Sequence, residues 1–219
     1  KLLIMVFDLR LKENFKNFIS GPSGCGKTTF LVDLIKNISQ FTIKPPLQIV
    51  YFYKEWQPKF DFLGEEYNVM FLLDNENIID QVKQLKSPSF VIFDDMLNST
   101  NLKAVAELYT VHGRHLNLSL AFLSQKLFLN NDYFRQISQN SDYICVFKNP
   151  RNSSEIRSLA MQITPQTLDL LDIYKKATIL PFSYLLINLT QECIPQLQYL
   201  SNIFNETHIT SVFVLSNCK

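Results

Sequence analysis

Four residues of one short segment, Gly21, Gly26, Lys27 and Thr28, have the types and spacing of a phosphate-binding P-loop, G-x-x-x-x-G-K-S/T. Glycines let backbone N–H groups turn toward phosphates, and the N-terminus of a following helix adds the positive end of its dipole. The lysine is expected to reach the β- and γ-phosphates, and the threonine hydroxyl to bind Mg²⁺. A chance glycine-rich turn is the alternative. The residues expected to hold a nucleoside triphosphate are Gly21, Pro22, Ser23, Gly24, Cys25, Gly26, Lys27, Thr28 and Thr29.

Two adjacent carboxylates, Asp94 and Asp95, follow the apolar run 90–93. A buried strand that ends in acids presents them at its carboxyl edge, the Walker B pattern. We expect Asp94 to hold Mg²⁺ through water and Asp95 to act as general base on the attacking water. An acid directly after the metal-binding aspartate is typical of motor ATPases and not of GTPases. Solvated aspartates in a strand-ending turn are the alternative.

A side-chain amide, Gln125, follows a third apolar run, 116–123. In motor ATPases this strand lies between the P-loop strand and the Walker B strand, so its last polar residue faces the γ-phosphate. We expect Gln125 to sense the phosphate or to orient the water. An ordinary polar strand end is the alternative.

Two arginines are candidates for a finger that completes a neighbouring subunit's site and stabilises the charge of the transition state. Arg114 precedes the strand that ends near Gln125, and Arg151 follows a later strand; Arg135 is a weaker third candidate. A solvated surface charge is the alternative for each. The expected catalytic residues are therefore Lys27, Asp95, Gln125, Arg114 and Arg151, with Thr28 and Asp94 as metal ligands.

The elements that must position these residues alternate along the chain. Apolar runs predict strands, and three- to four-residue spacing predicts helices. We expect an α/β fold, with a mostly parallel sheet covered by helices on both faces. Residues 1–14 are expected to be an N-terminal extension, 15–190 the P-loop ATPase domain, and 191–219 an unassigned C-terminal tail. Expected strands are 15–20, 47–53, 68–72, 89–95, 116–123, 143–147 and 184–189; expected helices follow the P-loop and span 75–85, 101–111, 132–138, 153–161 and 166–176.

Composition limits the partners. The 219 residues are 47% hydrophobic, which suits a globular domain, and the net charge of +1 restricts any nucleic-acid surface to a local patch. Four widely spaced cysteines without C-x-x-C indicate reduced thiols in an intracellular compartment. No apolar stretch has the length of a membrane span, so we expect no membrane partner.

Five segments carry a family resemblance: GPSGCGKTTF, YFYKEWQP, FVIFDDM, VHGRHLNLSLAFLSQKLF and YICVFKNPR. In this order, over residues 15–189, they resemble the FtsK/HerA-type genome-packaging ATPases. The most similar version is carried by Polinton (Maverick) transposons, adintoviruses and virophages, and is akin to the poxvirus-type packaging ATPase. The W-Q-P loop and the R-H…S-Q-x-L-F segment are more specific than the P-loop.

The resemblance implies a P-loop NTPase fold of the ASCE type that assembles as a homo-oligomeric ring. It also implies ATP hydrolysis with Mg²⁺, coupled to translocation of double-stranded DNA, irrespective of sequence, into a capsid. Proteins of the capsid or portal vertex would be further partners, and the resemblance implies a location in the nucleus or cytoplasm of a host cell or with a virion. One departure is Asn188, where related sequences tend to have an acid. Candidate DNA contacts are Lys54, Lys59, Lys148, Arg151 and Arg157.

Two other functions are compatible with a P-loop. A small-molecule kinase would usually have an arginine-rich lid, and no arginine cluster follows Gln125. A nucleotide-gated assembly or scaffold protein would bind ATP and barely hydrolyse it, against which the intact Asp95 speaks. An ABC-type ATPase would need an L-S-G-G-Q signature, which the sequence lacks. The single tryptophan, Trp56, could pack inside the domain, against a base or across a subunit contact.

Overall fold

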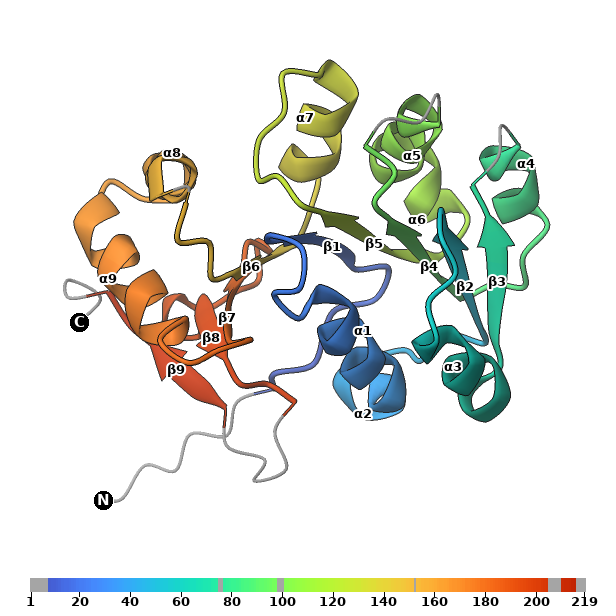
Figure 1. Cartoon of the computed structure of the whole chain (residues 1–219), viewed down its shortest axis with the longest axis horizontal. Coiled ribbons are helices and arrows are strands. Elements are labelled where there is room, and N and C mark those ends of the chain that lie inside the picture. Colours follow the sequence, from blue (N-terminus) through green and yellow to red (C-terminus); the bar gives the residue numbers. More distant parts are fainter. Residues whose placement is uncertain (1–7, 75–76, 98–100, 152, 205–209, 216–219) are drawn as a thin grey trace.

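A nine-stranded sheet forms the centre of the computed structural model, which describes residues 8–74, 77–97, 101–151, 153–204 and 210–215 (Figure 1). The strand order within these ranges is β3-β2-β4-β5-β1-β6-β7-β8-β9. The strands are β1 (Lys16–Ser20), β2 (Gln48–Tyr53), β3 (Val69–Leu73), β4 (Ser89–Asp94), β5 (Leu118–Ser124), β6 (Tyr143–Phe147), β7 (Tyr184–Asn188), β8 (Tyr199–Ser201) and β9 (Ser211–Phe213).

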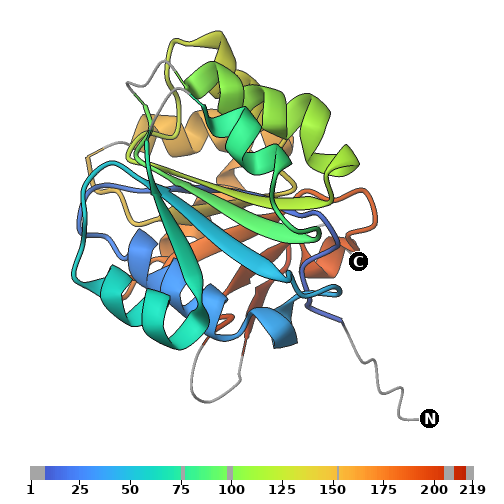
Figure 2. The ribbon, with the colours of Figure 1, turned by 90° about the vertical axis from the view of Figure 1, so that its right-hand side faces the viewer.

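Helices cover both faces of this sheet, and Figure 2 shows the two helical layers with the strands between them. Apolar side chains of α1 and α3 pack with one face, and those of α4, α5, α7, α8 and α9 with the other. The helices are α1 (Lys27–Lys36), α2 (Ile38–Phe41), α3 (Lys59–Tyr67), α4 (Ile78–Lys83), α5 (Leu102–Glu107), α6 (Gly113–His115), α7 (Asp132–Gln139), α8 (Ser153–Ile163) and α9 (Thr167–Ala177); a π-helical turn spans Leu108–His112 and a 3₁₀ turn Pro195–Leu197.

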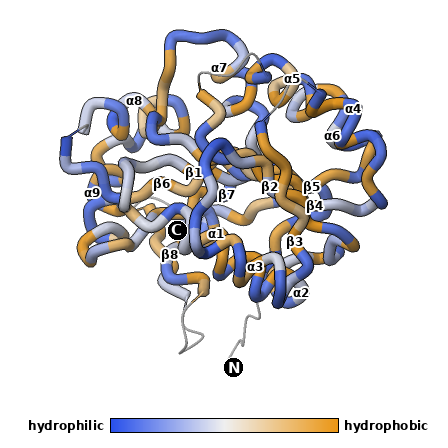
Figure 3. Tube along the Cα trace, turned by 45° about the vertical axis from the view of Figure 1, so that its right-hand side comes forward, coloured by the Kyte–Doolittle hydropathy of each residue, from blue (hydrophilic) through white to orange (hydrophobic). Residues whose placement is uncertain are grey.

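The central strands are buried on both faces, which is why their sequences are nearly continuous apolar runs. Successive side chains point to opposite faces: Phe18 of β1 packs against Phe122 and Phe134, whereas Ile19 packs with the α1 side. The hydrophobic colour of Figure 3 accordingly runs through the inner strands, while hydrophilic stretches lie on the outer helices and loops. Burial of both faces thereby fixes the pairing register of each central strand.

The six strands from β3 to β6 are parallel, and β7, β8 and β9 are antiparallel to their neighbours. The prediction of a mostly parallel α/β sheet with helices on both faces is confirmed. Strand β5 lies between β1 and β4, with Ser20 opposite Ser124 and Asp94 opposite Leu123. The carboxyl ends of β1, β4 and β5 therefore meet at one edge of the sheet.

The segment after β7 has elements that the sequence pattern did not predict. Strand β8 pairs with β7, and β9 pairs with β8; Tyr199 and Leu200 are buried. Such three-residue strands are too short for a detectable alternation of polar and apolar residues. No helix in the described ranges is long and apolar enough to cross a membrane.

The segment 54–61, which contains Trp56, lies outside every helix and strand predicted from the sequence. A turn is present, but helix α3 begins already at Lys59. The Trp56 ring is half exposed and lies 5.2–5.5 Å from the rings of Tyr53, Phe60 and Phe71. Of the three alternatives for Trp56, the structure shows packing within the domain.

Candidate functional site

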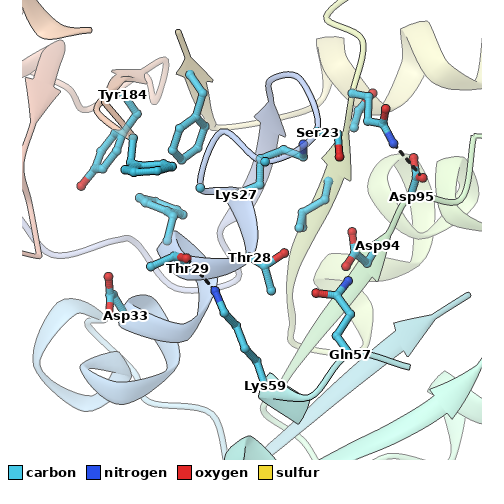
Figure 4. Close-up of a pocket in the computed structure, with 18 of the residues that line it drawn as sticks. Ser23, Lys27, Thr28, Thr29, Asp33, Gln57, Lys59, Asp94, Asp95 and Tyr184 are labelled. Atoms are coloured by element: carbon cyan, nitrogen blue, oxygen red, sulfur yellow. Dashed lines mark hydrogen bonds between the residues drawn. The ribbon is translucent and has the colours of Figure 1, made fainter. Parts of the chain in front are cut away.

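A cavity of about 1060 Å³ opens at the edge where β1, β4 and β5 end. Its walls come from the P-loop, α1, the segment 54–59, and the carboxyl ends of β4 and β5. The start of β7 and the segment after β8 close its other side. Figure 4 shows Asp94 and Asp95 on one side of Lys27, and Tyr184 with Asp33 on the other. The cavity thus has an acidic end and an aromatic end.

The P-loop connects buried β1 to α1 through a turn that requires glycine. The Gly21 N–H donates to the Ser124 carbonyl at 3.1 Å, which ties the loop to β5. A Cβ at Gly21 would lie 2.6 Å from Cys25 Sγ and from Phe147 Cβ. Gly26 has φ +109°, a conformation that glycine adopts without the cost other residues incur. The backbone thereby turns sharply into the first turn of α1.

The predicted nucleotide-binding residues divide into two groups. Those that line the cavity are Ser23, Gly24, Gly26, Lys27, Thr28 and Thr29. Gly21, Pro22 and Cys25 are not among the lining residues. Burial raises the pKa of the Cys25 thiol, so the neutral form is favoured beside the loop.

The Lys27 ammonium lies across the P-loop. Its Nζ donates to the carbonyls of Gly21 at 2.6 Å and Pro22 at 3.0 Å. The first turn of α1 has a second cation nearby, because Lys59 Nζ of α3 donates to Thr29 Oγ1 at 2.9 Å (Figure 4). Two ammonium groups therefore border the part of the cavity that the P-loop forms.

Asp94 is the last residue of β4 and is largely buried. Burial raises the pKa of its carboxyl and the Asp95 charge adds to the rise, while the hydrogen bond from Tyr51 and the Lys27 charge oppose it. The Tyr51 hydroxyl donates to Asp94 Oδ2 at 2.7 Å. Tyr51 lies on β2, beside β4, so this bond depends on the pairing of the two strands. The hydrogen bond to Oδ2 thus fixes the orientation of the Asp94 carboxylate.

Asp95 leaves the strand in a left-handed backbone conformation, φ +54°. Non-glycine residues rarely adopt this conformation, and such strain is concentrated at functional sites. The Gln125 amide at the end of β5 donates from Nε2 to Asp95 Oδ2 at 3.0 Å. The structure therefore brings together Asp94, Asp95, Gln125 and the P-loop, residues that the sequence placed on three separate segments.

The two candidate arginines lie at opposite edges of the sheet. Burial lowers the pKa of Lys16, at the start of β1, and the nearby Arg114 charge adds to that effect. Arg114 is therefore close to the edge away from the P-loop, whereas Arg151 follows β6 at the P-loop edge and is exposed. Neither lines the cavity formed by the described residues. The weaker candidate, Arg135, pairs with Asp132 at the surface.

Several cavity residues were not predicted from the sequence as parts of the site. Tyr51 carries no motif in the sequence, and Lys59 was predicted only as a DNA contact. The register of β2 against β4 brings Tyr51 to Asp94, and α3 brings Lys59 to Thr29. The aromatic end had no motif, and it is lined by Phe147, Phe182, Tyr184, Asn202 and Phe204.

Comparison with protein families identifies the chain. The family described as "Poxvirus A32 protein" matches residues 7–178. The chain belongs to the poxvirus A32 family. The match contains the P-loop, both aspartates and Gln125, and the predicted resemblance to FtsK/HerA-type packaging ATPases with poxvirus-type relatives is confirmed.

One solved structure supports the fold of this A32-family chain. The structure of B204, the DNA-packaging ATPase from Sulfolobus turreted icosahedral virus, aligns with a TM-score of 0.58 at 12% identity, covering 92% of this chain and 98% of B204. ATPases 2 and 3 of EccC from Thermomonospora curvata align with a TM-score of 0.45 at 16% identity, over 64% of this chain and 30% of that chain. No curated protein matches the chain. The A32-family chain is a nucleotide-binding ATPase with a P-loop fold.

Proposed function

We propose that this protein is a motor that hydrolyses ATP to move double-stranded DNA into a viral or virus-like capsid. The observation that carries the proposal is the cavity in which the P-loop, Asp94–Asp95 and Gln125 meet. Membership of the A32 family supports the same function, as does the fold shared with B204. An origin in a Polinton-type element and an intracellular or virion-associated location stay predictions.

The donor atoms at the acidic end fit Mg²⁺, which prefers oxygen ligands and usually binds one or two carboxylates together with substrate phosphates. The Thr28 hydroxyl and the Asp94 carboxylate line the same part of the cavity. We propose them as the metal ligands, directly or through water. Bound Mg²⁺ would neutralise charge on the β- and γ-phosphates.

We propose three roles for the chain's own residues in hydrolysis. The Lys27 ammonium neutralises phosphate charge, and the N–H groups of the P-loop orient the phosphates. The Asp95 carboxylate accepts the proton of the attacking water. Gln125 holds the Asp95 carboxylate by the 3.0 Å hydrogen bond and exchanges that bond for the γ-phosphate or the water when substrate binds.

We propose that Arg114 or Arg151 completes the site of a neighbouring subunit. Arg114 lies too far from the P-loop of its own subunit to act there, because the length of β1 separates them. Arg151 lies at the P-loop edge but outside the cavity. A role in hydrolysis for either arginine therefore requires the proposed homo-oligomeric ring, whose other partners would be capsid or portal-vertex proteins.

The DNA contacts proposed from the sequence need one revision. Lys54 and Lys59 line the nucleotide cavity, so we propose the exposed Lys148, Arg151 and Arg157 as contacts to the DNA phosphates. With a net charge of +1, a few basic side chains per subunit, repeated around a ring, would supply the attraction. Binding would be independent of sequence and would weaken steeply with salt.

The first test is nucleotide binding by the Lys27→Ala variant. Loss of the ammonium should abolish measurable Mg·ATP binding in calorimetry. The exposed Lys44 lies outside the cavity, so Lys44→Ala should bind as the wild type does. Retention of wild-type affinity by Lys27→Ala would rule out this site.

The second test is the ATPase rate of the assembled protein with and without duplex DNA at low salt. Stimulation that disappears in high salt is expected for a motor, and inorganic phosphate should be the product. Absence of DNA binding and of stimulation, even with capsid proteins added, would favour the nucleotide-gated scaffold. Transfer of the phosphate to a small molecule would favour the kinase.

A further inference from the structure

The aromatic end of the cavity has a rigid floor. Phe30 of α1, Phe147 of β6 and Tyr184 of β7 are buried and pack ring against ring, with Phe30 and Tyr184 4.8 Å apart and Phe147 and Tyr184 5.5 Å apart. Phe204 is half buried and lies 5.3 Å from Phe30. Mutual packing restricts these rings to one arrangement, so the apolar surface that they present to the cavity is preformed.

Phe182 differs from these rings because it is 69% exposed and yet lines the cavity. Ligand pockets are lined mainly by apolar and aromatic side chains, and Phe182 presents such a side chain to this cavity, unlike its exposed neighbour Leu180. A Cβ built on Gly26 would lie 3.4 Å from Phe182 Cβ, so Phe182 lies directly beside the last turn of the P-loop. Its ring is therefore within reach of a molecule whose phosphates lie in that loop.

The backbone around Phe182 is held in place. Phe182 has φ +61°, an unfavourable conformation for a bulky residue that persists only where the surroundings impose it. Lys148 Nζ donates to the Ile179 carbonyl at 3.2 Å, and Ser183 Oγ donates to the Leu180 carbonyl at 2.6 Å. These bonds fasten both sides of the turn and keep Phe182 at the cavity.

Polar groups connect the P-loop with the aromatic end. Thr29 and Asp33, one turn apart on α1, line the cavity between the two, and Figure 4 shows Asp33 on the same side of Lys27 as Tyr184. Asn202 also lines the cavity, and its Nδ2 donates to Ser211 Oγ at 3.3 Å. The series from phosphate donors through a carboxylate to aromatic rings and an amide matches the parts of a nucleotide: phosphates, sugar hydroxyls and base.

We propose that Phe182, Tyr184, Phe204 and Asn202, the base wall, bind the purine base of a nucleoside triphosphate, with the base stacked on Phe182. The inference rests on the proposed function, because it takes the phosphates to lie in the P-loop. Stacking on an aromatic ring recognises the face of the base, and the Asn202 amide lies at its edge. Since Asn202 and Phe204 follow β8, the segment after residue 190 forms part of the nucleotide site.

The test compares ATP with inorganic triphosphate, which has the phosphates but no base. Calorimetry with Mg²⁺ should show that wild type binds ATP more tightly than triphosphate. Phe182→Ala should weaken ATP binding roughly 5- to 150-fold, the range for loss of one stacked base, and leave triphosphate affinity unchanged. Phe182→Trp, which keeps an aromatic ring at this position, should bind ATP with an affinity near that of wild type. Leu180→Ala is the matched control, since Leu180 is equally exposed in the same turn but does not line the cavity.

The outcomes separate the base wall from the proposed function. If wild type binds neither ATP nor triphosphate, the proposed function fails. If triphosphate binds as tightly as ATP, or if Phe182→Ala binds ATP as wild type does, the base wall is wrong while the P-loop assignment stands. An equal loss of ATP and triphosphate affinity in Phe182→Ala would mean that Phe182 supports the loop, which also overturns the base wall.

Discussion

The phosphate end of the cavity is built from the ends of the neighbouring parallel strands β1, β4 and β5, whereas the aromatic end is built from β6, antiparallel β7 and the segment after β8. Parallel strands present all their carboxyl ends at one edge, so polar residues that follow them in sequence meet in space. Antiparallel additions bring together residues without a common motif. Phosphate binding and catalysis are therefore expected at the first end and binding of the base at the second. The predictions below test the first end, and the Phe182 variants described above test the second.

The largest effect is expected from subunits mixed in trans. Variants Arg114→Ala and Arg151→Ala should show that one of the two arginines supports hydrolysis, with a loss of about 10³–10⁵-fold in rate. Mixing that variant with Lys27→Ala subunits should restore part of the activity, because some contacts join an intact cavity to an intact arginine. The measurement is phosphate release across mixing ratios. No rescue, with assembly confirmed by light scattering, would count against a shared site.

A smaller effect, confined to the phosphate end, is expected for Asp95→Asn. The new side-chain amide has the shape of the Asp95 carboxylate and leaves Asp94 unchanged, but it cannot accept a proton from the attacking water. We expect kcat to fall about 10²–10⁴-fold while ATP affinity stays near wild type. Asp61→Asn on the exposed side of α3 is the control, because it removes a carboxylate that does not line the cavity. Normal ATP hydrolysis by Asp95→Asn would show that Asp95 is not the general base but an ordinary residue at the end of a strand.

Tyr51→Phe tests the hydroxyl that orients Asp94. Loss of such a partner typically weakens metal binding about 10–100-fold. The hydrogen bond from Tyr51 opposes the rise that burial causes in the pKa of Asp94, so its removal should raise that pKa further. The acid limb of Mg²⁺-dependent ATP binding should therefore move to higher pH. Tyr53→Phe, two residues along β2, should leave the pH profile in place; an unshifted profile in Tyr51→Phe would show that the bond is incidental.

The smallest effect is a gain in stability. Burial raises the pKa of the Asp94 carboxyl in the folded protein above its value in the unfolded chain. The favourable contribution of this carboxyl to folding stability is therefore complete below the unfolded pKa, and it is lost as pH rises through the folded pKa. At neutral pH the ionised carboxylate thus destabilises the nucleotide-free fold. Asp94→Asn should raise the melting temperature by a few degrees at pH 7, with no difference at acid pH, and should weaken Mg·ATP binding. A lower melting temperature at pH 7 would contradict this.

Sequence reasoning succeeded where the information is local or periodic. The strand, glycine loop and helix around Lys27 follow from a short motif, and the buried runs that end at Asp94 and Ser124 follow from hydropathy. It failed at α3, because the turn residues around Trp56 hid a helix beginning at Lys59. It also failed for β8 and β9, whose three residues each are too few for a periodic signal.

The amino-acid sequence by itself determined the chemistry of the phosphate end, because contiguous residues supply the P-loop and each acid or amide is tied to its own strand end. Only the tertiary structure decided which groups act on one another. The hydroxyl of Tyr51 reaches Asp94 through the register of β2 against β4, and Gln125 reaches Asp95 through the order of β4 and β5. The aromatic end depends wholly on the fold, because Phe182 and Phe204 reach the cavity only after antiparallel strands have folded back beside β6.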